Sequence, residues 1–201
     1  GGNFIWPGVE VGHVQTVRGL QKLGSIDIKT VSMTPLVFEA QNFLLDNECD
    51  HIKEKADPHM KPSPVSLMDH DQGKADTNWR TSTTYFMPST GDEILLGIDQ
   101  RVEEFTRVPK SHQEQVQVLK YDKGQRYTAH HDFFNPKLYQ KDTRTLENIQ
   151  GGRKNRMITV FWYLSDVEEG GETIFPRAGG RTGSVDFSDC TKGLKVKPKV
   201  G

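Results

Sequence analysis

The sequence reads RMITVFWYLSDVEEGGETIFP from Arg156 to Pro176, and this segment is the main indication of the fold class. It begins with Met157–Leu164, an apolar run of the length expected for a strand that is covered on both faces. Further strands are predicted at Glu172–Phe175 and at Leu194–Val200, where apolar residues alternate with lysines. The C-terminal part of the chain is therefore expected to consist mainly of strands.

The segments before this stretch follow a related pattern. Residues 116–121 and 126–133 are predicted strands, and Asp122-Lys-Gly124 between them predicts a turn. A charged insert follows at residues 135–154. The polar residues 61–78 show no periodicity and are predicted to form a loop.

Two helices are predicted in the N-terminal half. The first has Asp46 as its N-cap, and the second begins at a capping box of Thr90 and Glu93 and ends before Pro109. The apolar stripes are Leu45, Cys49, Ile52 and Ala56 in the first helix, and Ile94, Ile98, Val102 and Phe105 in the second. Helices followed by a run of short strands predict an α+β fold, in which helices pack on one side of a β-sandwich or barrel core.

The composition excludes several classes of protein. A length of 201 residues predicts a single domain with a sizeable core. The 26 lysines and arginines nearly balance the 27 aspartates and glutamates, so no nucleic-acid partner is expected. No apolar run reaches the roughly 18–20 residues that a membrane-spanning helix needs, so no membrane segment is expected in this chain.

Cysteines are few. Cys49 and Cys190 are the only two, which fits neither a disulfide-dense scaffold nor a cysteine-rich zinc site. Two alternatives follow: a disulfide between them, or two buried thiols.

The candidate metal ligands are His130 and Asp132. Side chains two residues apart on a strand point to the same face, so this pair should converge while His131 points to the opposite face. An imidazole, a carboxylate and one further histidine form the facial triad that holds non-haem iron and leaves positions open for a cosubstrate and oxygen. By itself a His-x-Asp spacing is a weak signal, because it also occurs on ordinary surface strands.

The residues around this pair strengthen the case. The stretch LKYDKGQRYTAHHDFF, Leu119–Phe134, resembles the first metal-binding region of the prolyl 4-hydroxylases, which are Fe(II)- and 2-oxoglutarate-dependent dioxygenases. Four further segments resemble the same family in the same order: Asn42–Leu44, Arg80–Thr83, Arg156–Pro176 and Cys190–Pro198. The resemblance, to the algal and plant type of the family, covers about residues 35–201.

The resemblance implies roles for individual residues. It assigns His130 and Asp132 to catalysis as iron ligands, and it places Tyr121 and Thr173 beside the 2-oxoglutarate carboxylate. The residues that it places along the peptide groove are Glu114, Tyr127 and Arg156. The family's third iron ligand and the lysine that pairs with 2-oxoglutarate have no counterpart here, since no histidine follows Asp132.

A fold and a domain organisation are implied in the same way. The expected core is a double-stranded β-helix, or jelly roll, supported by N-terminal helices. Residues 1–34 are expected to be an N-terminal extension, and residues 35–201 a dioxygenase domain that stops before its last strands.

The implied function is hydroxylation of peptidyl proline to 4-hydroxyproline in proline-rich or collagen-like proteins. Iron(II), 2-oxoglutarate and ascorbate are the expected cofactors, and O2 and a proline-rich peptide the expected substrates. Residence in the secretory pathway, in the endoplasmic reticulum or Golgi lumen, is expected from the family. Two alternatives stay open: a related dioxygenase with another substrate, and a non-catalytic peptide-binding module without a complete metal site.

Overall fold

The computed structural model describes residues 4–181 and 189–201, which form two compact units. The first unit comprises the described residues of Gly1–His59, Phe86–Val118 and Trp162–Gly201. The second unit comprises Met60–Tyr85 and Leu119–Phe161. Each unit is thus assembled from segments that are distant in the sequence.

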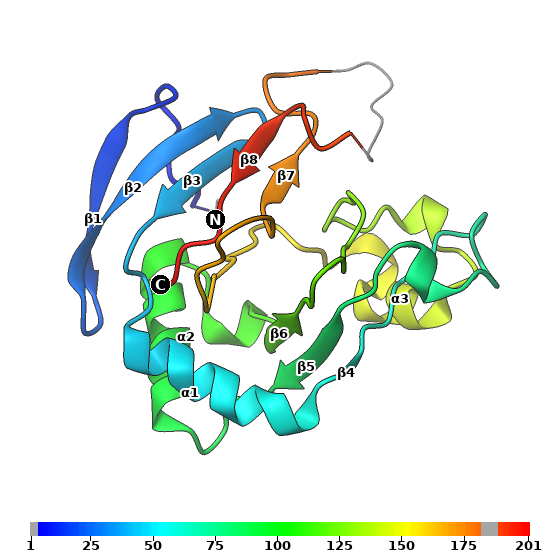
Figure 1. Cartoon of the computed structure of the whole chain (residues 1–201), viewed down its shortest axis with the longest axis horizontal. Helices are drawn as coiled ribbons and strands as arrows, with labels where there is room; N and C mark the ends of the chain where they lie inside the picture. The colour runs from blue at the N-terminus through cyan, green and yellow to red at the C-terminus, as the bar shows by residue number, and fades with distance from the viewer. Residues whose placement is uncertain (1–3, 182–188) are drawn as a thin grey trace. The chain divides into compact units, whose positions relative to one another are not determined.

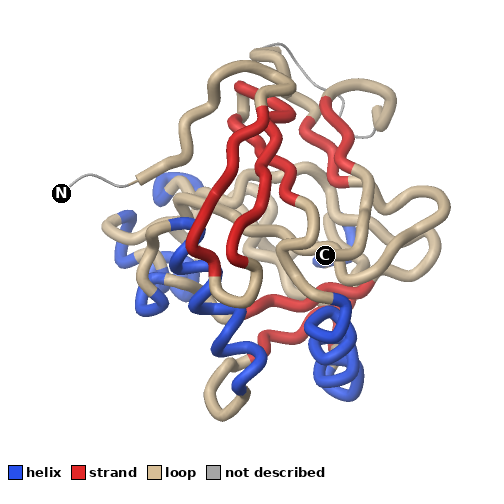
Figure 2. Tube along the Cα trace, turned by 90° about the vertical axis from the view of Figure 1, so that its left-hand side faces the viewer, coloured by secondary structure: helices blue, strands red, loops and turns tan. Residues whose placement is uncertain are grey.

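An antiparallel sheet of three strands forms the N-terminal part of the first unit (Figure 1). Its strands are β1 (Val14–Leu20), β2 (Gly24–Met33) and β3 (Leu36–Ala40), in the order β1-β2-β3. The long β1–β2 hairpin stands out among the red strands of Figure 2. Alternate residues of β2 are buried, as expected for a strand with one face on the core. This sheet crosses the boundary that was predicted after residue 34.

Two further strands of the first unit confirm the C-terminal strand predictions in part. β7 (Thr173–Phe175) and β8 (Leu194–Val196) pair in an antiparallel manner, with Thr173 opposite Val196. β8 ends four residues before the predicted strand does, because the chain turns away at Lys197-Pro198 and proline cannot donate to a ladder.

The two predicted helices are both present in this unit, as α1 (Asp46–Ala56) and α2 (Glu93–Thr106). The predicted caps are wrong by one or two residues. Leu45 is the N-cap of α1, and the Glu48 carboxylate accepts a hydrogen bond from the Leu45 N–H at 3.0 Å. Asp92 caps α2, because its carboxylate can reach two backbone N–H groups, those of Ile94 and Leu95.

The predicted apolar stripes are buried only in part. Cys49, Ile52 and Ala56 are buried on α1, whereas Leu45 is exposed because it lies in the extended backbone ahead of the helix. On α2, Ile98 and Val102 are buried, while the other two members of the stripe are half-buried.

The remaining elements are short. β4 (Lys61–Pro62), β5 (Thr83–Met87) and β6 (Val116–Lys120) form a small sheet in the order β4-β5-β6, and the residues of β5 and of β6 are divided between the two units. α3 (Thr143–Asn148) belongs to the second unit and lies within the predicted charged insert. The 3-10 helices of the two units are η1 (Asp57–His59), η2 (Asp76–Asn78), η3 (Lys110–His112), η4 (Pro136–Leu138) and η5 (Gln150–Gly152). The structure therefore combines helices with small sheets.

Two of the predicted strands are wrong. Residues 126–133 are irregular apart from one bridge between Tyr127 and Arg80, and residues 157–164 are not assigned as a strand. The apolar run does not have both faces covered, since Met157, Ile158 and Phe161 are each at least 40% exposed. An apolar run can form a strand only where a neighbouring strand pairs with its backbone, which sequence periodicity does not reveal.

The cysteine alternatives are also decided. Cys49 is buried on α1, Cys190 is exposed, and no disulfide joins them. The expectation of two buried thiols therefore holds for Cys49 and is wrong for Cys190. Within the described part of the chain, no helix has the length and apolar character needed to cross a membrane.

A buried ion pair connects the helices of the first unit. The side chains of Arg101 on α2 and Glu48 on α1 are both fully buried and share two hydrogen bonds of 2.7 Å. Arg101 also donates to the carbonyls of Phe43 and Gln21, at 2.7 and 3.1 Å. Burial alone would raise the pKa of Glu48, but hydrogen bonds from Arg101 and the Leu45 N–H outweigh it and lower the pKa.

Breaking this pair should destabilise the protein strongly. Arg101→Met leaves the Glu48 carboxylate buried without its partner, so the free energy of unfolding should fall by about 3–5 kcal/mol in urea denaturation. The double variant Arg101→Met/Glu48→Leu removes both charges and should recover much of that loss. Lys53→Ala, which removes the exposed pair with Asp50 on the same helix, is the control and should cost less than about 1 kcal/mol. A loss of that small size in Arg101→Met would contradict the prediction.

Asp92 carries a second charged cluster at the start of α2. One carboxylate oxygen caps the helix, and the other accepts hydrogen bonds from His51 Nε2 at 2.8 Å and from Lys55 Nζ. Burial acts to raise the pKa of Asp92, but the hydrogen bonds from Lys55, the Leu95 N–H and His51 outweigh it and lower the pKa well below its usual range. Ionised Asp92 therefore contributes stability that is present above its unfolded-state pKa and is lost in acid.

We expect Asp92→Ala to lower the free energy of unfolding at neutral pH by about 1–2 kcal/mol, because the helix cap is lost. Asp92→Asn keeps an oxygen for the cap but loses the ion pair. The gap in stability between wild type and Asp92→Asn should narrow as the pH falls from about 5 to about 3, because Asp92 takes up a proton in the unfolded chain while it stays ionised in the folded protein. The difference in stability between Asp92→Ala and Asp92→Asn should not change with pH, since neither variant has a titratable group at residue 92. A wild-type gap that is flat over this range would show that the ion pair does not stabilise the fold.

Candidate functional site

The candidate metal ligands lie in the second unit, on the segment that follows β6. The predicted turn is present, with the Gln125 N–H donating to the Asp122 carbonyl at 3.0 Å. Backbone hydrogen bonds then hold the segment against residues 79–81: Thr81 N–H donates to the Arg126 carbonyl at 3.0 Å, and Thr128 N–H to the Trp79 carbonyl at 2.8 Å. This pairing fixes the chain immediately before His130.

His130 and Asp132 converge as predicted, although the backbone between them is not a strand. Nε2 of His130 lies 3.3 Å from Oδ1 of Asp132, and both side chains are about 40% exposed. Metal bonds of about 2.0–2.2 Å at roughly a right angle place two donor atoms about 3 Å apart. The two side chains therefore fit a shared divalent metal ion.

Each ligand side chain is oriented through its other polar atom. Nδ1 of His130 lies 2.9 Å from the Thr128 carbonyl and therefore donates to it, which leaves Nε2 as the ring nitrogen that faces Asp132. Oδ2 of Asp132 accepts a hydrogen bond from the Thr159 hydroxyl. The atoms that face each other are thus Nε2 and Oδ1.

Asp132 is held in its ionised form. The hydrogen bond with His130 has the largest effect and lowers the pKa of Asp132, and burial acts against it. The Thr159 hydroxyl and the charges of His130 and Arg156 lower the pKa further, to about 2. A carboxylate in this state is ready to bind a cation at neutral pH.

Comparisons with known proteins show what the chain is similar to. Residues 116–201 match the family model described as the 2OG-Fe(II) oxygenase superfamily, and this range includes His130 and Asp132. The matched stretch covers fewer than half of the 201 residues of the chain. The resemblance inferred from the sequence is confirmed.

Several plant proteins are similar to the chain. The chain is 40% identical over 190 residues to probable prolyl 4-hydroxylase 3 of Arabidopsis thaliana, an alignment covering 92% of this chain and 62% of that protein. It is 40% identical over 196 residues to probable prolyl 4-hydroxylase 10 of the same plant, covering 92% and 64%. With prolyl 4-hydroxylase 2 the identity is 38% over 182 residues, covering 87% and 57%. The chain thus spans less than two thirds of the length of these relatives.

Tyr127 supports the histidine of the pair. Its ring stacks on the His130 imidazole with a centroid distance of 3.9 Å and an interplanar angle of 24°. The guanidinium of Arg80 lies 4.5 Å from the centroid of the same ring, and the buried Arg80 is itself held by the Ser82 hydroxyl at 3.0 Å. Burial raises the pKa of Tyr127, so its hydroxyl stays protonated.

Arg156 also lies at this site. Its positive charge lowers the pKa of Asp132, and its guanidinium lies 5.1 Å from the centroid of the Phe134 ring. Asn155 fixes the neighbouring backbone by two hydrogen bonds with Phe134, of 2.9 and 2.7 Å. The structure therefore places Arg156 beside the candidate metal ligands.

The other predicted site residues are distributed between the units. Tyr121 belongs to the second unit and is 42% exposed. Thr173 and Glu114 belong to the first unit. Thr173 accepts a hydrogen bond of 2.7 Å from the Tyr163 hydroxyl. The roles expected for Tyr121, Thr173 and Glu114 stay predictions.

A third metal ligand is not found in the part of the chain that the structure describes. Among residues 4–181 and 189–201, no group of three or more His, Cys, Asp or Glu side chains could hold a metal ion. The predicted ligands His130 and Asp132 thus account for two of the three that the facial triad needs.

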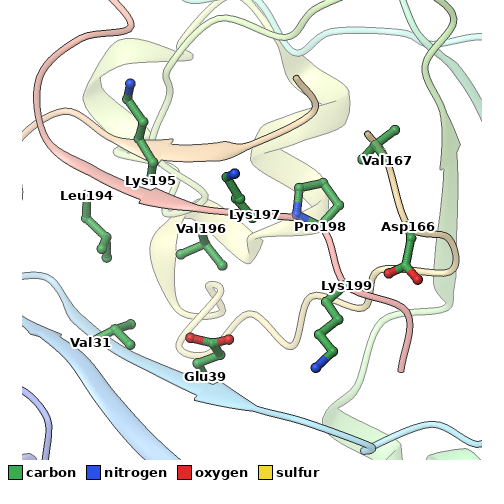
Figure 3. A pocket seen from close by; sticks show the side chains of 10 residues that line it. All are labelled: Val31, Glu39, Asp166, Val167, Leu194, Lys195, Val196, Lys197, Pro198 and Lys199. Carbon is green, nitrogen blue, oxygen red and sulfur yellow. The ribbon is translucent and has the colours of Figure 1, made fainter. Parts of the chain in front are cut away.

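The first unit contains a groove of about 540 Å³ beside β8 (Figure 3). Leu194 and Val196 project from β8 toward Val31 and Glu39, while Lys195 points the other way. Side chains of both signs line it, so its charge does not favour one class of ligand.

Thr159 and Arg80 contact site residues but carried no role in the sequence analysis. Arg80 lay in a segment that resembled the family, which was a usable signal. Thr159 lay in another such segment, Arg156–Pro176, but the local pattern does not show its contact with a carboxylate 27 residues earlier in the chain.

Loss of the Tyr127 ring should weaken metal binding, because the stacked ring restricts the His130 imidazole. We expect Tyr127→Ala to raise the dissociation constant for Co²⁺ about 3- to 10-fold in calorimetric titration, the range expected for one aromatic contact. Tyr127→Phe keeps the ring and should stay within about 2-fold of wild type. Equal affinities of these two variants would show that stacking does not position His130.

Proposed function

We propose that this protein hydroxylates peptidyl proline to 4-hydroxyproline in proline-rich or collagen-like proteins, using Fe(II), 2-oxoglutarate and O2. The observation that supports this best is the convergence of His130 Nε2 and Asp132 Oδ1 within the segment that matches the oxygenase family. The similarity to plant prolyl 4-hydroxylases supports the choice of reaction.

The proposal includes a finer fold than the small sheets show. Residues 35–201 belong to a dioxygenase domain whose core is a double-stranded β-helix. The superfamily match to residues 116–201 supports this arrangement.

Different residues of the second unit bind the metal and the peptide in this proposal. His130 and Asp132 hold the iron, which supplies the activation of O2 when it is bound with 2-oxoglutarate. Arg156 and Tyr127 lie beside these ligands and offer a guanidinium fork and an aromatic ring to the peptide substrate. Arg156 suits peptide carbonyls, because a guanidinium presents several donors in one plane.

The remaining assignments rest on the family resemblance. Tyr121 and Thr173 offer hydroxyls to the 2-oxoglutarate carboxylate, and Glu114 lines the peptide groove. Ascorbate maintains the iron in its reduced state. The enzyme works in the endoplasmic reticulum or Golgi lumen, where proline-rich secretory proteins are made.

Two other functions differ from this one in measurable ways. A related dioxygenase would release succinate without forming 4-hydroxyproline. A non-catalytic peptide-binding module would bind the peptide and release no succinate. The ordered ligand pair favours an enzyme over such a module, because both side chains are oriented by hydrogen bonds that leave Nε2 and Oδ1 for a metal.

The test is an assay with a proline-rich peptide, Fe(II), 2-oxoglutarate and ascorbate, in which succinate and 4-hydroxyproline are both measured by mass spectrometry. We expect one hydroxyproline per succinate, and a loss of at least about 100-fold in His130→Ala, because one of the metal ligands is removed. A peptide with alanine in place of proline is the matched control. Succinate without hydroxyproline, or peptide binding without succinate, would replace the proposal by one of the two alternatives.

A further inference from the structure

Thr159 is the one side chain of the predicted apolar run whose hydroxyl reaches the candidate metal ligands. It lies between the exposed Ile158 and the half-buried Val160, and its Oγ1 donates to Oδ2 of Asp132. The contact joins segments that are 27 residues apart in the sequence. It therefore fixes a carboxylate from outside the segment that carries it.

This hydrogen bond makes the two oxygens of Asp132 different. Oδ2 accepts a hydrogen bond from the Thr159 hydroxyl, whereas Oδ1 is the partner of His130 Nε2 at 3.3 Å, where a metal shared by the two side chains would bind. A carboxylate without such a contact could turn about its last bond and present either oxygen, or both, to a cation. With the contact, turning the group breaks a hydrogen bond to a charged acceptor, which is among the stronger kinds.

Coordination through one oxygen has a chemical consequence. A site of this class needs open positions for the cosubstrate and oxygen, and a carboxylate that binds through both oxygens occupies one of them. His130 is fixed in a comparable way through Nδ1 and the Thr128 carbonyl. Each ligand thus has one atom directed to the metal and one atom held by the protein.

We propose that Thr159 is a positioning residue, which holds Asp132 so that only Oδ1 binds the metal. This inference rests on the proposed function, because it takes His130 and Asp132 to be metal ligands. Thr159 does not touch the reacting atoms. It acts through Asp132, as partners of metal ligands commonly do.

The experiment measures Co²⁺ binding by calorimetry and the absorption spectrum of the bound Co²⁺, and neither depends on turnover. Thr159→Val keeps the shape of the side chain and removes the hydroxyl, so the dissociation constant should rise about tenfold and the spectrum should change. Thr159→Ser retains the hydroxyl and should bind within about twofold of wild type with the wild-type spectrum. Thr159→Ala is a second variant without the hydroxyl and should behave like Thr159→Val.

Two controls separate the inference from the function on which it rests. Thr143→Val removes an exposed hydroxyl at the start of α3 in the same unit and should leave Co²⁺ binding unchanged. His130→Ala should weaken binding far more than any Thr159 variant. If wild type does not bind Co²⁺, or if His130→Ala binds as wild type does, the proposed metal site is wrong. If the metal site holds but Thr159→Val binds as wild type does, or Thr159→Ser is as weak as Thr159→Val, the role of Thr159 is overturned.

Discussion

The first unit depends on the buried ion pair of Arg101 and Glu48. Both side chains are fully removed from solvent, so the charge of each is tolerated only in the presence of the other. The remaining donors of Arg101 are used by the carbonyls of Phe43 and Gln21. One guanidinium thus links α2 to α1, to the chain before α1 and to the β1–β2 turn. Since none of these contacts can be lost without leaving a buried charge or dipole unpaired, the elements must form together.

In the second unit, contacts with neighbouring residues hold the candidate metal ligands in place. His130 and Asp132 are about 40% exposed, so burial does not fix them. Three neighbours do so instead: the Thr128 carbonyl, the Thr159 hydroxyl and the Tyr127 ring. Such contacts are individually weak in water but directional. They suit the proposed metal site, because they align Nε2 and Oδ1 while both side chains stay accessible to solvent.

The sequence predicted local features better than pairings. Both helices were predicted, because apolar spacing and helix termini are encoded within a dozen residues. The strand predictions for residues 126–133 and 157–164 were wrong, because a strand depends on a partner that the local pattern does not specify. The convergence of His130 and Asp132 was predicted from strand alternation, yet the backbone there is irregular. The two side chains do converge, but strand alternation is not the cause. Their neighbouring residues orient them instead.

The charges around the pair bear on which ligands it can accept. Arg156 is close enough to Asp132 to lower its pKa, and Arg80 is held 4.5 Å above the ring that stacks on His130. Two guanidinium groups therefore accompany one carboxylate, and a bound divalent cation would increase the positive charge further. An anionic cosubstrate is favoured in such a field, whereas a cationic one is repelled. The residues that orient the candidate metal ligands and those that set the local charge thus favour the same kind of ligand, an anion bound beside a metal.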